Sequence, residues 1–154
     1  AVAGAAKHKD VKALGADRVI DYKTENYKEV ATNLDIVFDT LGGDYTFDAF
    51  RIIKEGGKIT TIVGAPDEET ATQMGMTDYE LPEKLSKLIE EKSAVYKFTW
   101  MQPNAKQLND IKRMIEEGTI KPIVDLVYSF EDGINAFEYL ATGSAKGKVI
   151  IALS

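Results

Sequence analysis

The sequence predicts an α/β fold in which a parallel, doubly wound sheet lies between two layers of helices. The first observation is the unbroken apolar run at residues 36–38, which is typical of a strand covered on both faces. The second is the acid and the glycine pair that follow it, Asp39 and Gly42–Gly43, at the strand end where open α/β sheets bind ligands. The third is that strand-like and helix-like segments alternate along nearly the whole chain, which indicates a parallel sheet.

The first third of the chain predicts two strands that alternate with two helices. Residues 1–3 resemble the last part of a strand. Good helix formers fill residues 5–14 and end at Gly15, a residue suited to the left-handed backbone that follows a helix. Residues 18–22 predict the next strand, and residues 27–33 predict a short, weak helix.

The middle of the chain predicts a helix, a strand and a loop. Over residues 46–54, Phe47, Phe50 and Ile53 fall on one stripe of a helix that a glycine pair ends. The β-branched residues 58–63 predict a strand that the next glycine breaks.

The acidic and polar residues 67–75 show no periodicity, so we expect a mobile loop there, of the kind that forms a lid. Leucines at helical spacing predict a helix over residues 81–89, and residues 94–100 predict the strand that follows it.

The last third continues the same alternation. Residues 103–117 predict a helix with one apolar face, and residues 124–128 predict an extended strand. Ser129 and Asp132, three residues apart, resemble a capping box that begins another helix. The apolar residues 147–153 predict a buried strand that closes the chain.

Composition sets limits on the class of protein. The 154 residues fit a single domain, which we expect to cover residues 1–154, and no apolar run approaches the roughly 20 residues of a membrane span. A formal net charge of −6 argues against nucleic acid as a partner, because binding to its backbone needs a basic face. The absence of cysteine excludes disulfides and thiolate metal sites and agrees with a reducing cytoplasm.

No catalytic or metal-binding set emerges from the polar residues. His8 is the only histidine, and we expect it to be exposed because it lies between two lysines on a short helix. A metal needs several ligands, and no Ser-His-Asp or Cys-His set can be assembled from this chain. The paired glutamates at residues 68–69, 90–91 and 116–117 are predicted to be solvated.

Four stretches of the chain form a recognisable series, with the sequences KALGADRVIDY at residues 12–22, DIVFDTLGG at 35–43, EGGK at 55–58, and FEYL followed by GKV within 137–149. In this order and spacing they resemble the medium-chain dehydrogenase/reductase superfamily over essentially the whole chain. The branch that they resemble most is that of the zinc-independent quinone oxidoreductases and enone reductases.

This resemblance implies a truncated Rossmann fold. A complete member would carry an N-terminal catalytic domain and then the first strand, glycine-rich turn and first helix of the nucleotide-binding domain, all of which are missing from residues 1–154. The glycine-rich turn holds the cofactor pyrophosphate at a helix N-terminus. We therefore expect this fragment to bind nucleotide weakly or not at all, and to be inactive by itself.

The resemblance also implies a cofactor preference. Lys7 matches the basic residue that pairs with the 2′-phosphate of NADPH, and Tyr22 matches the tyrosine that flanks this phosphate. NAD-preferring enzymes place an acid at the end of the second strand, and residues 2–6 contain none. These features favour NADPH over NADH. The alternatives are a solvated lysine in the first turn of a helix and an ordinary aromatic residue at a strand end.

Further cofactor contacts follow from the same resemblance. Asp39, Thr40, Leu41 and Gly42 match residues that pass near the adenosine ribose and the nicotinamide side of the cofactor. Val63 and Gly64 match a strand end whose backbone faces the nicotinamide carboxamide. Trp100 and Met101 end another strand at this edge, although simple packing explains Trp100 equally well.

The function implied by the resemblance is hydride transfer from NADPH to a quinone or to the β-carbon of an α,β-unsaturated carbonyl compound. No catalytic residue is assigned to this chain, because the substrate pocket of the superfamily lies largely in the missing domain. A zinc-type alcohol dehydrogenase of the same superfamily and a non-catalytic nucleotide-binding or interaction module are the alternatives. Exposed strand edges predict association, with a homodimer through the last strand, residues 148–153, as the expected contact.

Overall fold

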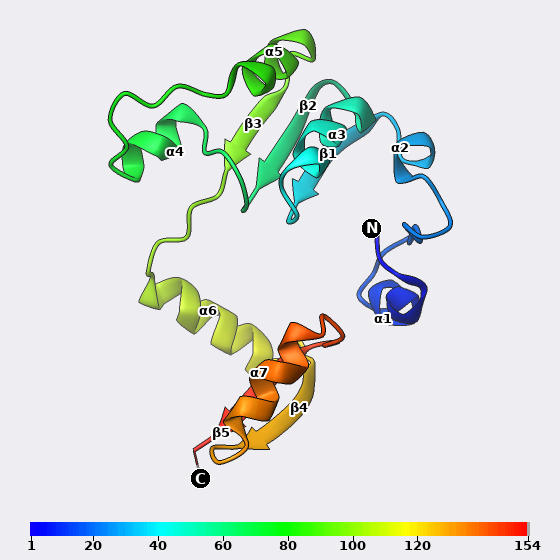
Figure 1. Ribbon diagram of the computed structural model, residues 1–154, viewed down its shortest axis with the longest axis vertical. Helices are drawn as coiled ribbons and strands as arrows, with labels where there is room; N and C mark the ends of the chain where they lie inside the picture. The colour runs from blue at the N-terminus through cyan, green and yellow to red at the C-terminus, as the bar shows by residue number, and fades with distance from the viewer. Residues whose placement is uncertain (154) are drawn as a thin grey trace. The chain divides into compact units, whose positions relative to one another are not determined.

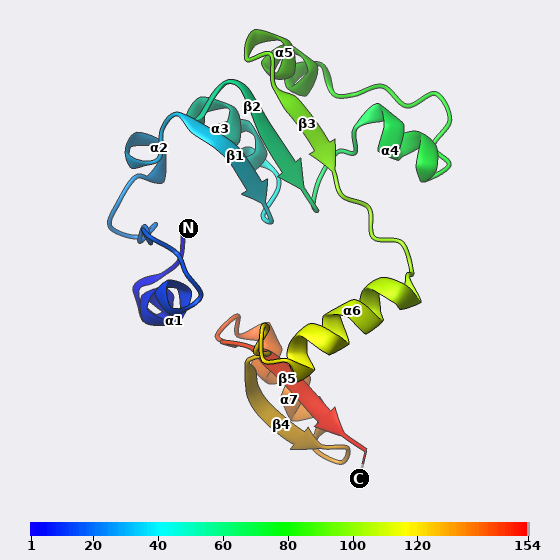
Figure 2. The same ribbon diagram turned by 180° about the vertical axis from the view of Figure 1, so that it is seen from behind.

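The computed structural model describes residues 1–153 and divides into two compact units, one of residues Ala1–Met101 and one that starts at Gln102. The first unit is built on a three-stranded parallel sheet of β1 (Leu34–Asp39), β2 (Ile53–Thr61) and β3 (Val95–Phe98). The strands lie side by side in the order β1-β2-β3 (Figure 1, Figure 2). The predicted parallel α/β class is therefore confirmed.

One face of this sheet carries the core. Ile59 and Tyr96, on neighbouring strands, pack with Phe50 of α3 (Asp44–Ile52) and Leu85 of α5 (Glu83–Glu91). Phe50 and Ile59 are each 1% exposed, and the ring of Phe50 stacks on that of Tyr96 at 6.4 Å between centroids. This packing follows from the predicted apolar stripe, since helix side chains at such a spacing face one way.

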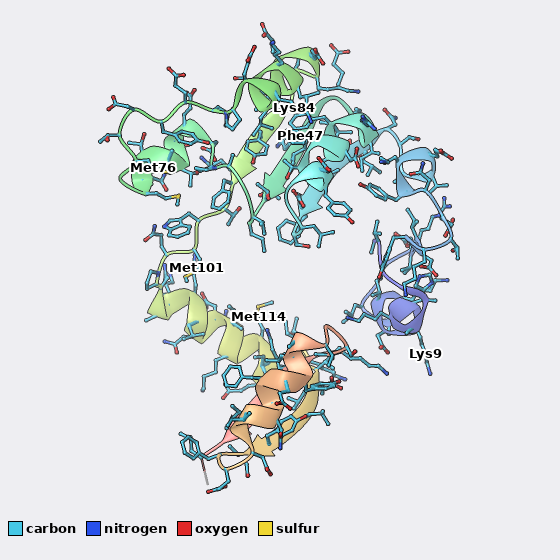
Figure 3. The ribbon with its side chains drawn as sticks, viewed as in Figure 1. Lys9, Phe47, Met76, Lys84, Met101 and Met114 are labelled. Carbon is cyan, nitrogen blue, oxygen red and sulfur yellow. The ribbon has the colours of Figure 1, made fainter. Side chains whose placement is uncertain are left out.

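At the margin of this core, Lys84 of α5 places its Nζ atom 3.7 Å from the ring centroid of Phe47 on α3 (Figure 3). This cation–π contact links the two helices, which cover the same side of the sheet.

The opposite face of the sheet is open within Ala1–Met101. Ile36 and Phe38 are 62% and 61% exposed, and Val95 on β3 is 53% exposed. Side chains alternate along a strand, so only Val37 between them turns toward the core. Within Ala1–Met101, the expectation that residues 36–38 are covered on both faces is therefore wrong.

The N-terminal segment contains less strand than predicted. Val2 and Ile20 form one parallel bridge, and between them lie the 3₁₀ turn η1 (Ala5–Lys7) and α1 (His8–Ala13). The strand predicted over residues 18–22 is reduced to this bridge. The reason is a turn at Asp21, whose carboxylate accepts the backbone N–H of Lys23 at 3.0 Å.

Two predicted helices have different bounds. Helix α2 (Tyr27–Val30) ends three residues before the predicted residue 33, since Ala31 is already extended. Helix α3 begins and ends two residues earlier than expected, and the glycine pair lies inside β2 rather than at the helix end.

Gly56–Gly57 coincide with an irregularity in the pairing of β1 and β2. Gly56 has φ +68°, and a Cβ on Gly57 would lie 2.9 Å from the carbonyl oxygen of Lys54. The glycines therefore permit a bulged strand, a role that the sequence pattern does not reveal.

The predicted mobile loop at residues 67–75 is instead a short helix, α4 (Glu68–Gln73). Its N-cap is Asp67, whose side chain accepts the backbone N–H of Thr70. Thr70 and Ala71 are 2% and 1% exposed, so α4 is anchored to the rest of its unit. After α5, the predicted strand over residues 94–100 is confirmed as the shorter β3.

The second unit contains α6 (Ala105–Glu116) and a two-stranded parallel sheet of β4 (Val124–Ser129) and β5 (Lys148–Ala152), joined through α7 (Gly133–Ala141). Ser129 Oγ accepts the backbone N–H of Asp132 at 3.2 Å, as a capping box requires. However, α7 begins only at Gly133, after Asp132, so the prediction that Ser129 caps this helix is wrong.

The last strand, β5, is only partly buried, with Ile150 40% exposed. The predicted full burial of residues 147–153 is therefore wrong within the described part of the chain. Only glycine fits at residue 147, just before β5, because a Cβ there would lie 2.3 Å from the carbonyl oxygen of Ile123.

No helix formed by residues 1–153 has the length and apolar character needed to cross a bilayer. The expectation of one domain over residues 1–154 stays a prediction.

Because Ile59 is fully buried and Ile36 is not, we expect Ile59→Val to destabilise the chain by about 1 kcal/mol and Ile36→Val by less than about 0.5 kcal/mol. The two substitutions remove the same methyl group from neighbouring strands. Urea unfolding followed by circular dichroism measures both, and equal losses would contradict the assignment of the core to one face.

Candidate functional site

The carboxyl ends of β1 and β2 meet closely at one edge of the sheet. Gly42, just after β1, has φ +73°, and a Cβ added to it would lie 2.9 Å from Cγ1 of Val63, just after β2. Only glycine allows this approach. The predicted residues Gly42 and Val63 are therefore brought into contact.

Asp39 holds the turn that makes this approach possible. Its Oδ1 atom accepts the backbone N–H groups of Leu41 at 2.9 Å and Gly42 at 3.0 Å. Its Oδ2 atom accepts the hydroxyl of Thr46 on α3 at 2.5 Å. Asp39 is 6% exposed, so these bonds replace water around a buried carboxylate. The side chain of Asp39 shapes the turn, while Thr40 and Leu41 remain exposed above it.

Thr61 fixes the segment after β2 in a similar way. It is fully buried, donates its hydroxyl to the carbonyl oxygen of Val63 at 2.7 Å and accepts the backbone N–H of Val63 at 3.1 Å. The two bonds to the buried Thr61 hydroxyl thus fix the backbone of Val63. The next residue, Gly64, has φ +105°, and no atom lies within 4 Å of a Cβ added to it.

The third strand ends at the same edge. The backbone N–H of Thr99 donates to the carbonyl oxygen of Thr61 at 2.7 Å. Trp100 stacks on Phe98 with 6.4 Å between ring centroids and is 47% exposed, and Met101 is 75% exposed. Eight of the ten predicted site residues therefore lie at or just after the ends of three neighbouring parallel strands, where ligand sites form in open α/β sheets.

The other two predicted residues, Lys7 and Tyr22, each contact Gly4. The backbone N–H of Lys7 donates to the carbonyl oxygen of Gly4 at 2.9 Å, and the ring of Tyr22 lies 3.6 Å from a Cβ built on Gly4. Both residues are exposed, with Tyr22 at 57%. A lysine and a phenol thus flank a short acid-free turn.

His8 differs from the expectation of exposure. It is half-buried, and its Nε2 atom lies 3.0 Å from the carbonyl oxygen of Ala3. This contact ties α1 to the residues just before Gly4, so His8 supports the turn.

A shallow pocket of about 670 Å³ lies beside Tyr22, lined mainly by residues 22–28 and by part of α3. In it, the ring of Tyr27 stacks on that of Tyr45 with 6.3 Å between centroids, and the Tyr27 hydroxyl donates to Asp48 at 3.0 Å. Burial, followed by this hydrogen bond, raises the pKa of Tyr27 to about 12.

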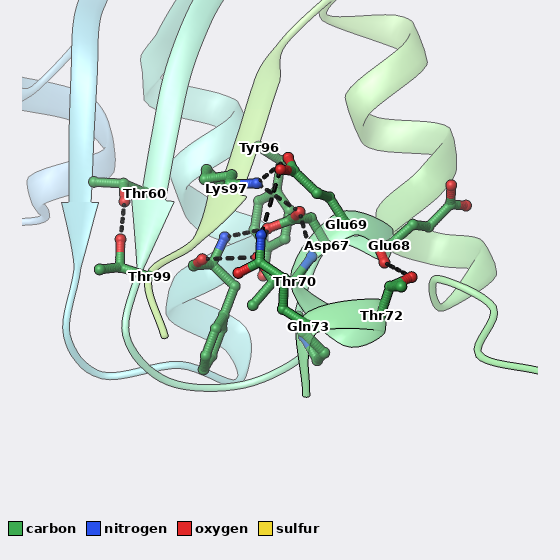
Figure 4. A network of polar contacts seen from close by, with 12 residues as sticks. Thr60, Asp67, Glu68, Glu69, Thr70, Thr72, Gln73, Tyr96, Lys97 and Thr99 are labelled. Atoms are coloured by element: carbon green, nitrogen blue, oxygen red, sulfur yellow. Dashed lines mark hydrogen bonds and ion pairs between the residues drawn. The ribbon is translucent and has the colours of Figure 1, made fainter. Parts of the chain in front are cut away.

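Asp67 connects the segment after β2 with β3 (Figure 4). Its Oδ2 atom accepts the backbone N–H of Phe98 at 2.7 Å and the hydroxyl of Thr70 at 2.8 Å. Its Oδ1 atom accepts the backbone N–H of Thr70 and the ammonium of Lys97, each at 3.1 Å. Burial raises the pKa of Asp67, but the hydrogen bonds from Phe98, Thr70 and Lys97 outweigh it and lower this pKa to about 2.

Within residues 1–153, no group of three or more histidine, cysteine, aspartate or glutamate side chains is placed to hold a metal ion. The described residues therefore do not fit a zinc centre.

A protein-family model described as zinc-binding dehydrogenase matches residues 14–151. The chain belongs to this family. The structure of a quinone oxidoreductase from Coxiella burnetii superposes with a TM-score of 0.77 at 23% identity, covering 99% of this chain and 44% of that one. This likeness confirms the α/β fold. The family match over residues 14–151 confirms the resemblance that the sequence shows to medium-chain dehydrogenases and reductases.

Two curated relatives are similar in sequence over most of the chain. A 2-methylene-furan-3-one reductase of Solanum lycopersicum is 31% identical over 143 residues, which are 92% of this chain and 30% of that protein. A chloroplastic NADPH-dependent alkenal/one oxidoreductase of Arabidopsis thaliana is 32% identical over 153 residues, which are 98% of this chain and 32% of that protein. This zinc-binding dehydrogenase chain thus spans about a third of the length of these relatives.

Four residues that shape this edge escaped the sequence reasoning: Thr46, Thr61, Asp67 and Tyr96. Asp67 had a local signal, because an aspartate followed by two glutamates is typical of a helix N-terminus. The other three gave no local signal. Thr46 bonds to Asp39, seven residues away, Thr61 bonds to Val63 and to Asp39, and Tyr96 bonds to Ala65, 31 residues away.

Gly42→Ala is expected to cost about 2–4 kcal/mol, because strain at positive φ adds to a clash with Val63. Gly75→Ala is the matched control: Gly75 has φ +77° just after α4 and nothing lies near an added Cβ, so this substitution should cost only about 1 kcal/mol. Adding Val63→Ala should restore part of the loss in the Gly42 variant. Urea unfolding gives these values, and equal costs for the two glycines would refute the close approach.

The lowered pKa of Asp67 predicts a pH-dependent contribution to stability. This stabilisation is fully present above the pKa of Asp67 in the unfolded chain, near 3.8, and is lost as the pH falls through the folded-state pKa of about 2. Asp67→Asn should therefore cost about 2 kcal/mol at pH 7, and the difference from the unmodified chain should shrink between pH 4 and pH 2. Glu68→Gln, at an exposed neighbour, serves as the control in urea unfolding at each pH. If the difference in free energy of unfolding between Asp67→Asn and the unmodified chain is the same at every pH, the prediction is wrong.

Proposed function

We propose that this chain is the nucleotide-binding part of an NADPH-dependent oxidoreductase that transfers hydride to a quinone or an α,β-unsaturated carbonyl compound. The observation that carries the cofactor assignment is that the backbone of Lys7 and the ring of Tyr22 both contact Gly4, in a turn without an acid. The names of the two curated relatives, an enone-type reductase and an alkenal/one oxidoreductase, support the substrate class.

The residues at Gly4 suit a phosphate on the ribose 2′-hydroxyl. The Lys7 ammonium supplies a positive charge and the exposed Tyr22 hydroxyl supplies a hydrogen-bond donor, and both suit a phosphate dianion. An acid in the same turn would instead accept a hydrogen bond from a free 2′-hydroxyl and repel a phosphate. This turn therefore discriminates between the two nicotinamide cofactors.

The edge after β1 and β2 suits the opposite end of the cofactor. NADPH supplies the hydride when it is bound, and the protein orients it. Val63 and Gly64 are both exposed at this edge. The backbone N–H and carbonyl oxygen of Val63 are bonded to Thr61, which holds Val63 in place and leaves the backbone of Gly64 to meet the cofactor. The chemistry that this chain contributes is thus binding and orientation.

We also propose that the protein forms a homodimer through β5 and works in the cytoplasm. Within residues 102–153, β5 pairs with β4 alone, so its other edge has free backbone groups suited to a second strand. The cytoplasmic location is supported by the absence of cysteine, which agrees with a reducing compartment.

The test is a fluorescence titration of the full-length protein with NADPH and with NADH. Lys7→Glu is expected to weaken NADPH binding about tenfold or more and to leave NADH binding nearly unchanged, since only NADPH carries the 2′-phosphate. Lys9→Glu is the matched control, because Lys9 is an exposed lysine on the adjoining helix and makes the same charge change (Figure 3).

A cofactor preference that is unaltered by Lys7→Glu, or altered equally by Lys9→Glu, would overturn the assignment. Zinc bound by the full-length protein and needed for alcohol oxidation would indicate an alcohol dehydrogenase instead. Nucleotide binding without turnover of any enone or quinone would indicate a non-catalytic module.

A further inference from the structure

The segment that follows Gly64 is attached to the rest of the first unit at three successive residues. The hydroxyl of Tyr96 donates to the carbonyl oxygen of Ala65 at 2.7 Å, and that of Tyr79 donates to the carbonyl oxygen of Pro66 at 2.8 Å. The carboxylate of Asp67 then binds the backbone N–H of Phe98 on β3. Ala65 and Asp67 are thus tied to β3, and Pro66 between them is tied to Tyr79.

Within residues 63–67, Gly64 is the residue for which no hydrogen bond or close side-chain contact is seen. It has positive φ, it is exposed, and an added Cβ would meet no atom within 4 Å. On its amino side Val63 is held by Thr61, and on its carboxyl side Ala65 is held by Tyr96. The position of the Gly64 backbone is therefore set by the anchors on its two sides.

We propose that Asp67 is a positioning residue that, together with Tyr96, fixes the Val63–Gly64 backbone where the nicotinamide end of the cofactor binds. This inference rests on the proposed function, since it assigns a cause to the geometry of the same edge. Asp67 acts through the segment and does not contact the cofactor itself.

The contacts of Asp67 suit this role better than that of a simple helix cap. A cap needs only the bond from the backbone N–H of Thr70, which Oδ1 accepts. The Oδ2 atom instead accepts from Phe98, 31 residues away in the sequence. The Thr70 hydroxyl, between Asp67 Oδ2 at 2.8 Å and the carbonyl oxygen of Phe98 at 3.1 Å, reinforces the same link.

Lys97 completes the arrangement on the outer side. Its ammonium lies 3.1 Å from Asp67 Oδ1 and 2.6 Å from the carboxylate of Glu69 (Figure 4). The negative charge of Asp67 is thus paired with the positive charge of Lys97, which stabilises the carboxylate in its position.

The experiment compares two ligands in the full-length protein: NADPH, and 2′,5′-ADP, which carries the 2′-phosphate but has no nicotinamide. Asp67→Ala and Tyr96→Phe are each expected to weaken NADPH binding about fivefold and to change 2′,5′-ADP binding by less than about twofold. Tyr96→Phe keeps the buried ring and removes only the hydroxyl, so it tests the anchor even if Asp67→Ala fails to fold. Glu68→Ala, a neighbouring exposed acid, should affect neither ligand.

The outcomes separate this inference from the proposed function. Lys7→Glu should weaken both NADPH and 2′,5′-ADP, and its failure to do so would refute the proposed cofactor site itself. Suppose that Lys7→Glu behaves as expected, but that Asp67→Ala and Tyr96→Phe weaken the binding of both ligands equally, or of neither. The positioning role is then wrong. A general loss of structure would weaken both ligands, so only the selective loss of NADPH binding supports the inference.

Trp100 provides an independent readout. It is the single tryptophan of residues 1–154 and stacks on Phe98, whose backbone N–H is bound by Asp67. In the full-length protein, the emission of Trp100 is the difference between the spectra with and without Trp100→Phe. Loss of the anchor should therefore shift the tryptophan emission maximum in Asp67→Ala but not in Glu68→Ala. An unchanged spectrum in Asp67→Ala would show that the end of β3 does not depend on this carboxylate, which would contradict the proposal.

Discussion

The buried carboxylate of Asp39 is the constraint on which the ligand edge of the sheet depends. It binds two backbone N–H groups of its own turn and the hydroxyl of Thr46 on the next helix. Leaving these donors unpaired in a buried site would cost about 1–3 kcal/mol each, so the turn has little freedom to adopt another shape. That shape brings Gly42 against Val63 and aligns the ends of β1 and β2. The geometry available to a cofactor therefore follows from a residue whose side chain faces inward.

Much of this arrangement could be predicted from the sequence, because it depends on local patterns. Alternating strand and helix signals indicate a parallel sheet, and parallel strands end at a common edge. The residues after β1, β2 and β3 were therefore expected together, and they lie together. The contacts that Lys7 and Tyr22 each make with Gly4 also agree with the family resemblance, although the role of the two residues in cofactor binding stays a prediction.

The remaining features depend on contacts between distant residues, which a single sequence does not reveal. The acidic run at residues 67–75 suggested a solvated loop, yet Asp67 is held by a partner 31 residues away. Residues 36–38 suggested a strand buried on both faces, but exposure of Ile36 and Phe38 depends on which elements cover the sheet. The strand predicted at residues 18–22 is replaced by a turn, because a side chain at Asp21 competes for the backbone.

The central claim is that the turn at Gly4 and the edge at Val63–Gly64 hold the two ends of one NADPH molecule. A crystal structure of the full-length protein with NADPH tests it most directly. The account predicts the 2′-phosphate within hydrogen-bond distance of Lys7 Nζ and Tyr22 Oη, and the nicotinamide carboxamide against the backbone of Val63 and Gly64. A cofactor bound with its 2′-phosphate away from Lys7, or with its nicotinamide away from the ends of β1 and β2, would contradict it.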